Sequence, residues 1–352
     1  MIQRQFKLKL TKAQEVLLVE WLWMGTGLFN WALRKIELDA ADGLYYTKQG
    51  FQNLLADHSK KLGMPSHMIQ GLLVQAYISW ERCFKKLAKK PRLKSARNRL
   101  NSLPFPNPIK TPVGTRVKLP FMGEVRFHRQ DIPAGSIKGG RIIRRTSGWY
   151  LALTIDAQPN QIPAINDGVI GIDPGYNHLI TQSNGVKVEN PKELLGAIKR
   201  LGQAQRGHDK KAVARLHERI ANQRKDRNHK LSRQLVAENA IIAFSKDNLR
   251  GLSRTGFGKS VTAASHGQLR SMLAYKSRAG GRKYIEVPGR NSTRSCSACG
   301  ALTGPQGRAG LSVRQWECSA CGTPHDRDVN AAINTLMAAV GMTVEGGLRH
   351  AA

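Results

Sequence analysis

The sequence predicts an α+β multidomain protein, in which a helical lobe interrupts a small β-barrel and an α/β domain with an inserted metal-binding ribbon follows. Three observations predict this fold class. Over most of the first 100 residues, apolar side chains recur at helical spacing. Residues 113–156 form short strand-like runs between glycines and prolines. From residue 168, strand-like and helical segments alternate, and two cysteine pairs lie near the C-terminus.

The charge of the chain indicates a polyanionic partner, and nucleic acid is the obvious one. The 352 residues include 56 Lys and Arg against 24 Asp and Glu, which gives a formal net charge of +32. No apolar run reaches the roughly 18 residues of a membrane-spanning helix. Lys7, Lys9 and Lys12 interrupt the apolar residues that a secretory signal would need. We therefore expect a cytoplasmic protein with reduced thiols, no membrane partner and no small-molecule substrate.

The N-terminal region predicts one strand followed by helices. Residues 5–10 alternate between polar and apolar side chains, which is typical of a half-buried strand. Thr11 then begins a helix, and Gln14 is placed to complete a capping box. Further helical patterns cover about 49–62 and 66–90. We expect these segments to form a small helical bundle.

Three tryptophans in the first helix have two interpretations. Trp21, Trp23 and Trp31 could stack on nucleic-acid bases, but tryptophans in a helical pattern more often belong to the core, which is what we expect here. Cys83, the one cysteine outside the pairs, lies in a helical pattern and is expected to be a small core residue.

The segment 85–101 is strongly basic and runs into a proline-rich linker. Its sequence, KKLAKKPRLKSARNRLN, contains no acidic residue, and Pro91 breaks the preceding helix. A solvated surface arm would have the same composition. We favour an arm that contacts phosphates, in part through Lys94, Arg97 and Arg99.

After a linker at 157–167, a second domain begins with an apolar strand that ends at Asp173. Two further strands, a helical region at 191–239, a buried strand at 240–244, a helix at about 261–278 and a strand at 282–287 follow in this order. The long second helix of the 191–239 region has a basic side that we expect to face nucleic acid. The residues of this side that we expect to bind nucleic acid are Arg219, Arg224, Lys225, Arg227 and Lys230.

Four of the five cysteines form two C-x-x-C pairs, Cys296 with Cys299 and Cys318 with Cys321. Each pair presents two thiolates from one turn, and two such turns supply the four ligands of a structural Zn²⁺ site. Gly300 and Gly322 follow the pairs, where the backbone of each turn requires a positive φ. Two disulfides would be the alternative in an oxidising compartment. We predict a zinc ribbon within residues 291–325.

The residues after the ribbon carry a resemblance to a known family. A helix begins near Asp326, and the run from Asp328 reads D-x-N-A-A. This end, together with the segment RIANQRKDRNHKLSRQLV, resembles the TnpB family of transposon-encoded, RNA-guided DNA nucleases, which are related to compact type V CRISPR effectors. The order of elements matches an RNase H-like (RuvC) domain. The resemblance implies a wedge-like β-barrel at 1–10 and 112–157, a recognition lobe at 11–111 and the nuclease domain at 168–352.

The resemblance also implies an active site of three carboxylates that bind Mg²⁺. Asp173 and Asp328 fill the first and third positions, but Ser245 stands where the family usually has glutamate. We predict that Glu286 on the next strand replaces it, with Asp247 as the chief rival. Glu238 is a weaker candidate, and Asp326 is expected only to cap the helix.

The expected function is RNA-guided, Mg²⁺-dependent cleavage of double-stranded DNA, with a guide RNA from the same locus, in the nucleoid of a prokaryotic cell. Ser245 leaves two alternatives open: a nuclease-dead, repressor-like DNA-binding protein, and a transposase-associated RNA-binding protein with weak chemistry. A zinc-ribbon transcription or ribosomal protein would explain the charge and the cysteines, but not Asp173 and Asp328 in this order.

Overall fold

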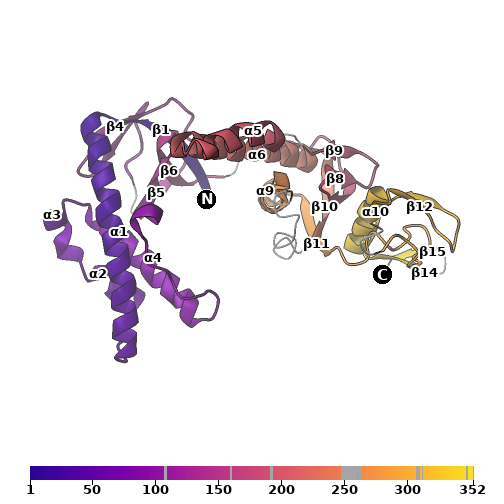
Figure 1. Ribbon diagram of the computed structural model, residues 1–352, viewed down its shortest axis with the longest axis horizontal. Helices are drawn as coiled ribbons and strands as arrows, with labels where there is room; N and C mark the ends of the chain where they lie inside the picture. The colour runs from indigo at the N-terminus through magenta and orange to yellow at the C-terminus, as the bar shows by residue number, and fades with distance from the viewer. Residues whose placement is uncertain are drawn as a thin grey trace. The chain divides into compact units, whose positions relative to one another are not determined.

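The computed structural model describes residues 1–106, 109–158, 161–190, 193–246, 260, 263–306, 310, 312–345 and 348–351 (Figure 1). The chain divides into two compact units, Met1–Pro159 and Asn160–Ala352. The first unit contains one antiparallel sheet and a group of helices. The second contains a mixed sheet, its helices and the cysteine ribbon.

The sheet of the first unit has six strands in the order β2-β5-β6-β1-β4-β3. These strands are β1 (Ile2–Lys9), β2 (Ser102–Phe105), β3 (Arg116–Leu119), β4 (Gly123–Phe127), β5 (Ser136–Arg145) and β6 (Gly148–Asp156). Strand β2 lies in the segment expected to be a linker, and Pro104 is compatible with it because β2 is an edge strand. Among the described strands, the edges β2 and β3 do not pair with each other, so the sheet is open where a closed barrel was expected.

The helices of the first unit begin with the 30-residue α1 (Lys12–Ala41). The predicted capping box is confirmed, because the Gln14 amide donates to Thr11 Oγ1 at 3.2 Å and the Thr11 amide donates to Gln14 Oε1 at 3.1 Å. The remaining helices are α2 (Lys48–Asn53), α3 (Ser59–Leu62) and α4 (Ser66–Phe84), with short 3₁₀ turns at Ala56–His58 and Ala96–Asn98. Helix α4 ends six residues before the predicted boundary, where Lys86 adopts a positive φ of 56°.

The prediction that all three tryptophans of α1 are core residues holds for Trp21 alone. Trp21 is fully buried, and its Nε1 donates to the carbonyl of Gly63 at 2.8 Å. Trp23 is 50% exposed and Trp31 is 38% exposed. Two residues correspond to about 200° around a helix, so the burial of Trp21 turns Trp23 toward the opposite side of α1.

Helix α1 is long and apolar enough to cross a membrane by length and composition, although no uninterrupted apolar run in it reaches that length. Within its most apolar window, 44% of the helix is buried inside the protein. Leu18, Trp21 and Leu22 belong to the core of the first unit. A core helix of a folded domain passes the same test, so the length of α1 is weak evidence for a membrane.

The sheet of the second unit has the order β11-β10-β7-β8-β9. Its strands are β7 (Gly168–Pro174), β8 (His178–Gln182), β9 (Lys187–Glu189), β10 (Asn239–Lys246) and β11 (Lys283–Pro288). Strands β7, β10 and β11 are parallel neighbours, and β8 and β9 continue the sheet antiparallel, which is the arrangement that the resemblance to an RNase H-like domain implies. The carboxyl ends of the three parallel strands therefore share one edge.

The helices of the second unit are α5 (Glu193–Arg206), α6 (Lys210–Glu238), α9 (His266–Ala279) and α10 (Arg327–Val340). Helices α6 and α9 pack on each other, and the buried Lys276 of α9 donates to the His229 carbonyl and to Ser232 Oγ of α6. Two short hairpins complete the unit: β12 (Gln315–Glu317) with β13 (Pro324–Asp326), and β14 (Met342–Glu345) with β15 (Leu348–Ala351).

Candidate active site and zinc ribbon

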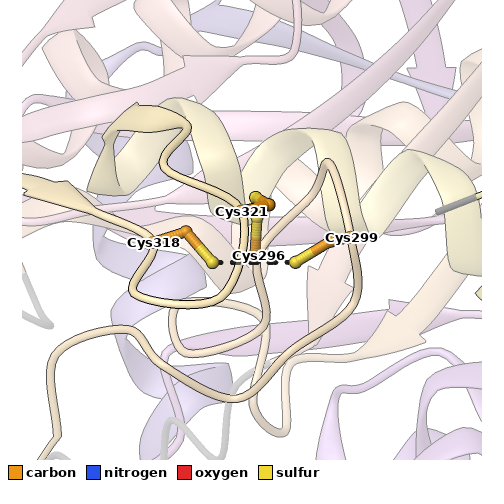
Figure 2. A group of neighbouring side chains, drawn as sticks. All are labelled: Cys296, Cys299, Cys318 and Cys321. Atoms are coloured by element: carbon orange, nitrogen blue, oxygen red, sulfur yellow. Dashed lines mark hydrogen bonds between the residues drawn. The ribbon is translucent and has the colours of Figure 1, made fainter. Parts of the chain in front are cut away.

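The four paired cysteines meet in one cluster, in which all four sulfur atoms lie within 4.8 Å of one another (Figure 2). Cys296 Sγ lies 3.7 Å from Cys321 Sγ, and Cys299 Sγ lies 3.6 Å from Cys318 Sγ. A tetrahedral Zn²⁺ with Zn–S bonds of about 2.3 Å requires sulfurs about 3.8 Å apart. All five cysteines are free, which excludes the two-disulfide alternative for this structure. The spacing fits a structural zinc that has no open position for water.

The two turns that hold the sulfurs have the same backbone design. Gly300 has φ 82° and Gly322 has φ 67°, as predicted, and their amides donate to the carbonyls of Cys296 and Cys318, each at 2.8 Å. The Thr303 hydroxyl donates to Cys318 Sγ at 3.2 Å and lowers the pKa of that thiol to about 6. The hydrogen bond from Thr303 therefore favours a thiolate at Cys318, the form that binds metal.

Two asparagines of α10 fix the first cysteine turn to that helix. Asn330 Oδ1 accepts from the Ser297 amide at 2.8 Å, and Asn330 Nδ2 donates to the Ser295 carbonyl at 2.8 Å. Asn334, one helical turn later, donates to the carbonyls of Ser292 and Ser295 at 2.8 and 2.7 Å. Asn330 is 1% exposed, so its side chain belongs to the interior. The asparagine of the D-x-N-A-A motif thus joins the ribbon to the helix that carries Asp328.

Asp326 and Asp328 have different roles at the start of α10. Asp326 is the N-cap, and its Oδ1 accepts from the amides of Asp328 and Val329 at 3.1 and 3.0 Å. Burial opposes its charge, but Lys187 at 2.6 Å and these amides outweigh burial and hold the pKa of Asp326 below its usual value. Asp328 has Arg314 Nη1 3.6 Å from its Oδ1 and keeps 20% side-chain exposure.

Helix α10 lies directly against β7 at Gly171. A Cβ atom at Gly171 would lie 2.1 Å from the Ala332 carbonyl oxygen and 2.8 Å from Leu336 Cβ. Side chains alternate along a strand, so Asp173 is on the same face of β7 as Gly171, about 7 Å further along. Asp328 precedes Ala332 by one helical turn, about 6 Å along α10. Asp173 is therefore on the face of β7 that α10 covers, and Asp328 is one turn from the helix residue that touches this face.

Ser245 shares this face. Ile172 of β7 is in register with Phe244 of β10, so the next residues, Asp173 and Ser245, lie side by side. Ser245 is 1% exposed, and its hydroxyl has no hydrogen-bond partner in the part of the chain that the structure describes. The position next to Asp173 is thus a small, buried polar side chain without a carboxylate.

The structure does not bring Glu286 to Asp173 and Asp328. Glu286 is in register with Phe244, whereas Ser245 pairs with Val287, so Glu286 is on the opposite face of the sheet from Ser245 and Asp173. Arg270 of α9 binds the Glu286 carboxylate with two nitrogens at 3.1 and 2.7 Å, and Lys246 Nζ lies 3.1 Å away. Burial opposes the charge on Glu286, but these cations outweigh it and lower the pKa of Glu286. Its placement is that of an ion-pair partner for α9.

The rival carboxylate, Asp247, lies outside the described residues. Glu238 accepts from Gln234 Nε2 at 3.0 Å on α6, at the end of β10 opposite to Ser245. Among the described residues, the cysteine cluster is the one group of three or more metal-binding side chains close enough to share an ion.

The basic arm is docked on α1. Asn30 donates to the Lys94 carbonyl and accepts from the Lys94 amide, both at 2.8 Å, and the Leu100 amide donates to Thr26 Oγ1 at 3.3 Å. The Arg99 guanidinium lies 4.7 Å from the centre of the Trp23 ring, and Arg97 is exposed. The arm is thus held against α1, with Arg97 exposed.

The predicted basic face of α6 divides into two groups. Arg219, Lys225 and Lys230 are exposed, although Lys230 pairs with Asp226 at 2.8 Å. Arg227 instead donates to the Ala264 carbonyl and to Ser265 Oγ, which places it in the contact with the start of α9. Arg224 is half-buried. The exposed residues can contact a phosphate backbone. Arg227 instead stabilises the contact between α6 and the start of α9.

Comparisons with known proteins show which family the chain resembles. Residues 153–255 match the family model described as "Probable transposase" (OrfB_IS605), and residues 266–335 match "Cas12f1-like, TNB domain". The chain is 33% identical over 289 residues to a "Putative RNA-guided DNA endonuclease" of Streptomyces pristinaespiralis, covering 76% of this chain and 70% of that protein. It is 25% identical over 303 residues to "Putative RNA-guided DNA endonuclease InsQ" of Escherichia coli K12, covering 78% and 74%.

One similar solved structure is described as "Cryo-EM structure of the Cas12f1-sgRNA-target DNA complex", and its protein chain aligns over 95% of this chain and 99% of its own length. The sequence identity is 17% and the TM-score is 0.38.

Proposed function

The chain belongs to the TnpB family, and from this premise we propose that it is an RNA-guided DNA endonuclease of a transposon that hydrolyses phosphodiester bonds with Mg²⁺ at a RuvC-type site. The partners would be a guide RNA from the same locus and double-stranded target DNA, in the cytoplasm of a prokaryotic cell. The observation that carries the proposal is that α10, which begins with Asp328, packs at backbone distance on Gly171, on the face of β7 that also carries Asp173. The two relatives named above, which are described as putative RNA-guided DNA endonucleases, also support the proposal.

The donor set that Asp173 and Asp328 would supply suits magnesium. Carboxylate oxygens are the hard ligands that Mg²⁺ prefers, and the two aspartates come from different elements. Gly171 lets α10, the helix of Asp328, approach at backbone distance the strand that carries Asp173, which supports a site shared by the two carboxylates. Bound Mg²⁺ would supply an activated water and stabilise the leaving oxygen. The protein's own part is to hold both carboxylates in place before the DNA arrives.

Ser245 supports a second candidate, an RNA-guided DNA-binding protein that does not cut. The buried hydroxyl of Ser245 adds no charge beside Asp173, and Glu286 is on the other face of the sheet. Two described carboxylates would then bind metal more weakly than three. Both candidates share the same RNA and DNA partners, so the difference between them is cleavage.

The test is a cleavage assay on the protein purified with its co-expressed RNA. We expect Mg²⁺-dependent cutting of a plasmid that carries a sequence matching the bound RNA, and no cutting without RNA. Affinity for that RNA should fall steeply with salt, because the arm and α6 present many cations to phosphates. Guided DNA binding without any cutting would favour the second candidate, and cutting that is equally strong without RNA would contradict both.

The predicted role of Glu286 has its own test. Because its carboxylate is bound by Arg270 and Lys246 on the face away from Asp173, we expect Glu286→Gln to keep the cleavage rate within about twofold. A loss as large as that of Asp173→Ala would restore Glu286 as a ligand. Ser245→Glu places a carboxylate beside Asp173, and an increase in cleavage would show that the position lacks one.

A further inference from the structure

One face of α1 carries a groove that the proposed nuclease chemistry does not use. The groove has a volume of about 550 Å³ and is open to solvent. It is lined from the basic arm by Leu93 and from α1 by Gly27, Asn30, Trp31, Arg34, Lys35, Leu38 and Asp39. Such a volume is in the range of sites that hold small organic groups. Trp23, one helical turn before Gly27, extends the exposed aromatic surface along the helix.

In the part of the chain that the structure describes, no packing contact requires a glycine at position 27. A Cβ atom at Gly27 would meet nothing within 4 Å, and its φ is not positive. Gly25, two residues earlier, differs because its Cβ would lie 3.1 and 3.3 Å from the side chains of Leu72 and Leu103. Glycine within a helix costs about 1 kcal/mol relative to alanine. The absent side chain of Gly27 instead leaves the floor open between Trp23 and Trp31.

The charges of the groove favour an anionic occupant. Arg34 is exposed and has no acidic partner in the described parts of the chain, whereas the nearby acids of α1 are already paired, Glu37 with Lys90 and Asp39 with Lys35 and Tyr46. Arg99 lies over the Trp23 ring. Asn30 holds the arm against the groove through its two hydrogen bonds to Lys94. Flat aromatic surface beside cations is the chemistry that binds unpaired nucleotides.

We propose that this groove binds unpaired bases of the guide RNA, with a base stacked on Trp31 and the neighbouring phosphate held by Arg34. RNA is the chosen occupant because the groove is continuous with the arm that would bind the guide phosphates, so the assignment rests on the proposed function. Gly27 keeps the space beside Trp31 free for the base. Trp23, already covered on one side by Arg99, positions that guanidinium for the adjoining phosphate.

The experiment measures the affinity of the full-length protein for a fluorescein-labelled 12-nucleotide oligouridylate at two salt concentrations. Trp31→Ala should weaken binding about tenfold at both, because stacking of a base on an aromatic ring does not depend on salt. Trp31→Phe should recover most of the loss. Arg34→Gln should lower the slope of log affinity against log salt by about one. Gly27→Leu should weaken binding as Trp31→Ala does, without unfolding, since its site is open.

Two matched controls separate the groove from general effects. Gly27→Ala adds one methyl group to open space and should bind normally with a more stable helix. Tyr45→Ala removes an aromatic side chain that is 77% exposed but does not line the groove, and should bind normally. The quenching of tryptophan fluorescence by the oligonucleotide should disappear in Trp31→Phe and persist in Tyr45→Ala.

Unchanged affinity in Trp31→Ala and Gly27→Leu would overturn the proposal. So would tighter binding of the matching oligodeoxythymidylate, which would assign the groove to DNA. Conversion of a dimer to a monomer by Trp31→Ala, with unchanged affinity, would also overturn it and make the face a contact between two copies. None of these measurements requires cleavage, so they are distinct from a failure of the proposed nuclease.

Discussion

Asp328→Ala is expected to lower Mg²⁺-dependent DNA cleavage by roughly 1,000-fold or more while leaving the affinity for guide RNA unchanged. A metal-assisted hydrolysis loses most of its rate when a metal ligand is removed. Asp328 is on α10 of the second unit, remote in sequence from the arm that we expect to bind RNA. Asp173→Ala should have the same effect. Rates of plasmid cutting and the dissociation constant for the co-purified RNA are the two measurements.

Asp326→Ala is the matched control for this prediction. Asp326 is two residues from Asp328 but accepts two helix amides and pairs with Lys187. Its removal should cost about 1 kcal/mol of stability as a lost N-cap, with cleavage nearly unchanged in the folded protein. If Asp326→Ala stayed folded and lost cleavage as fully as Asp328→Ala, the catalytic aspartate would have been misassigned. An equal loss of affinity for guide RNA in all three variants would indicate misfolding.

Cys318→Ser is expected to remove the structural zinc and to open the ribbon. The reduced unmodified protein should contain about one zinc per chain, and the variant should contain nearly none. Free energies of metal binding in small zinc domains are about 10–16 kcal/mol, far more than such a ribbon gains from its own core. Because Asn330 and Asn334 hold the first cysteine turn against α10, cleavage should fall as well. Elemental analysis and thermal melting measure both effects.

Cys83→Ser is the control for the zinc prediction. Cys83 is a half-buried residue at the end of α4, outside the cluster, so its replacement should leave the zinc content unchanged. A metal-free protein with disulfides between the paired cysteines would refute the prediction. The free thiols of the structure and the sulfur separations near 3.7 Å argue for the metal.

Local signals predicted much of this structure. The capping box at Thr11 and the positive φ of Gly300 and Gly322 follow from residue types within a few positions of each other. The parallel neighbours β7, β10 and β11 are far apart in sequence, and their pairing was implied by the RNase H-like order of elements. The four cysteines are predictable because their spacing admits few geometries. The capping box and the two cysteine turns depend on interactions between residues that are close in sequence, so the sequence alone predicts them.

The face of Glu286 could not be predicted in this way. Neighbouring strands in the correct order still leave the register open, and a shift of one residue moves a side chain to the other face of the sheet. Position 287, not 286, pairs with Ser245. Arg270, which binds Glu286, comes from α9 and is 16 residues away in sequence. That partner becomes evident once α9 is seen to pack beside β11.

The tryptophans of α1 and the asparagines of α10 show a second limit. Trp21 and Trp23 are the same residue type on the same helix. The packing of α1 against α4 and β2 decides which of the two is buried. The sequence does not show that Asn330 and Asn334 join the ribbon to α10, although their spacing of one helical turn places both on the same side of that helix. Their partners are main-chain carbonyls and one main-chain amide of the ribbon, which every residue type carries, so the sequence does not identify them.

The asparagine contacts of α10 have a consequence for recombination between relatives. The first cysteine turn is hydrogen-bonded to a helix that begins after the second pair, so the ribbon ends structurally at Asn334 and not at Cys321. A chimaera with a crossover between Cys321 and Asn330 would join each ribbon to a foreign helix. A crossover after Asn334 would carry the ribbon and its helix contacts together, and the fit of Ala332 to Gly171 would be a backbone contact to match.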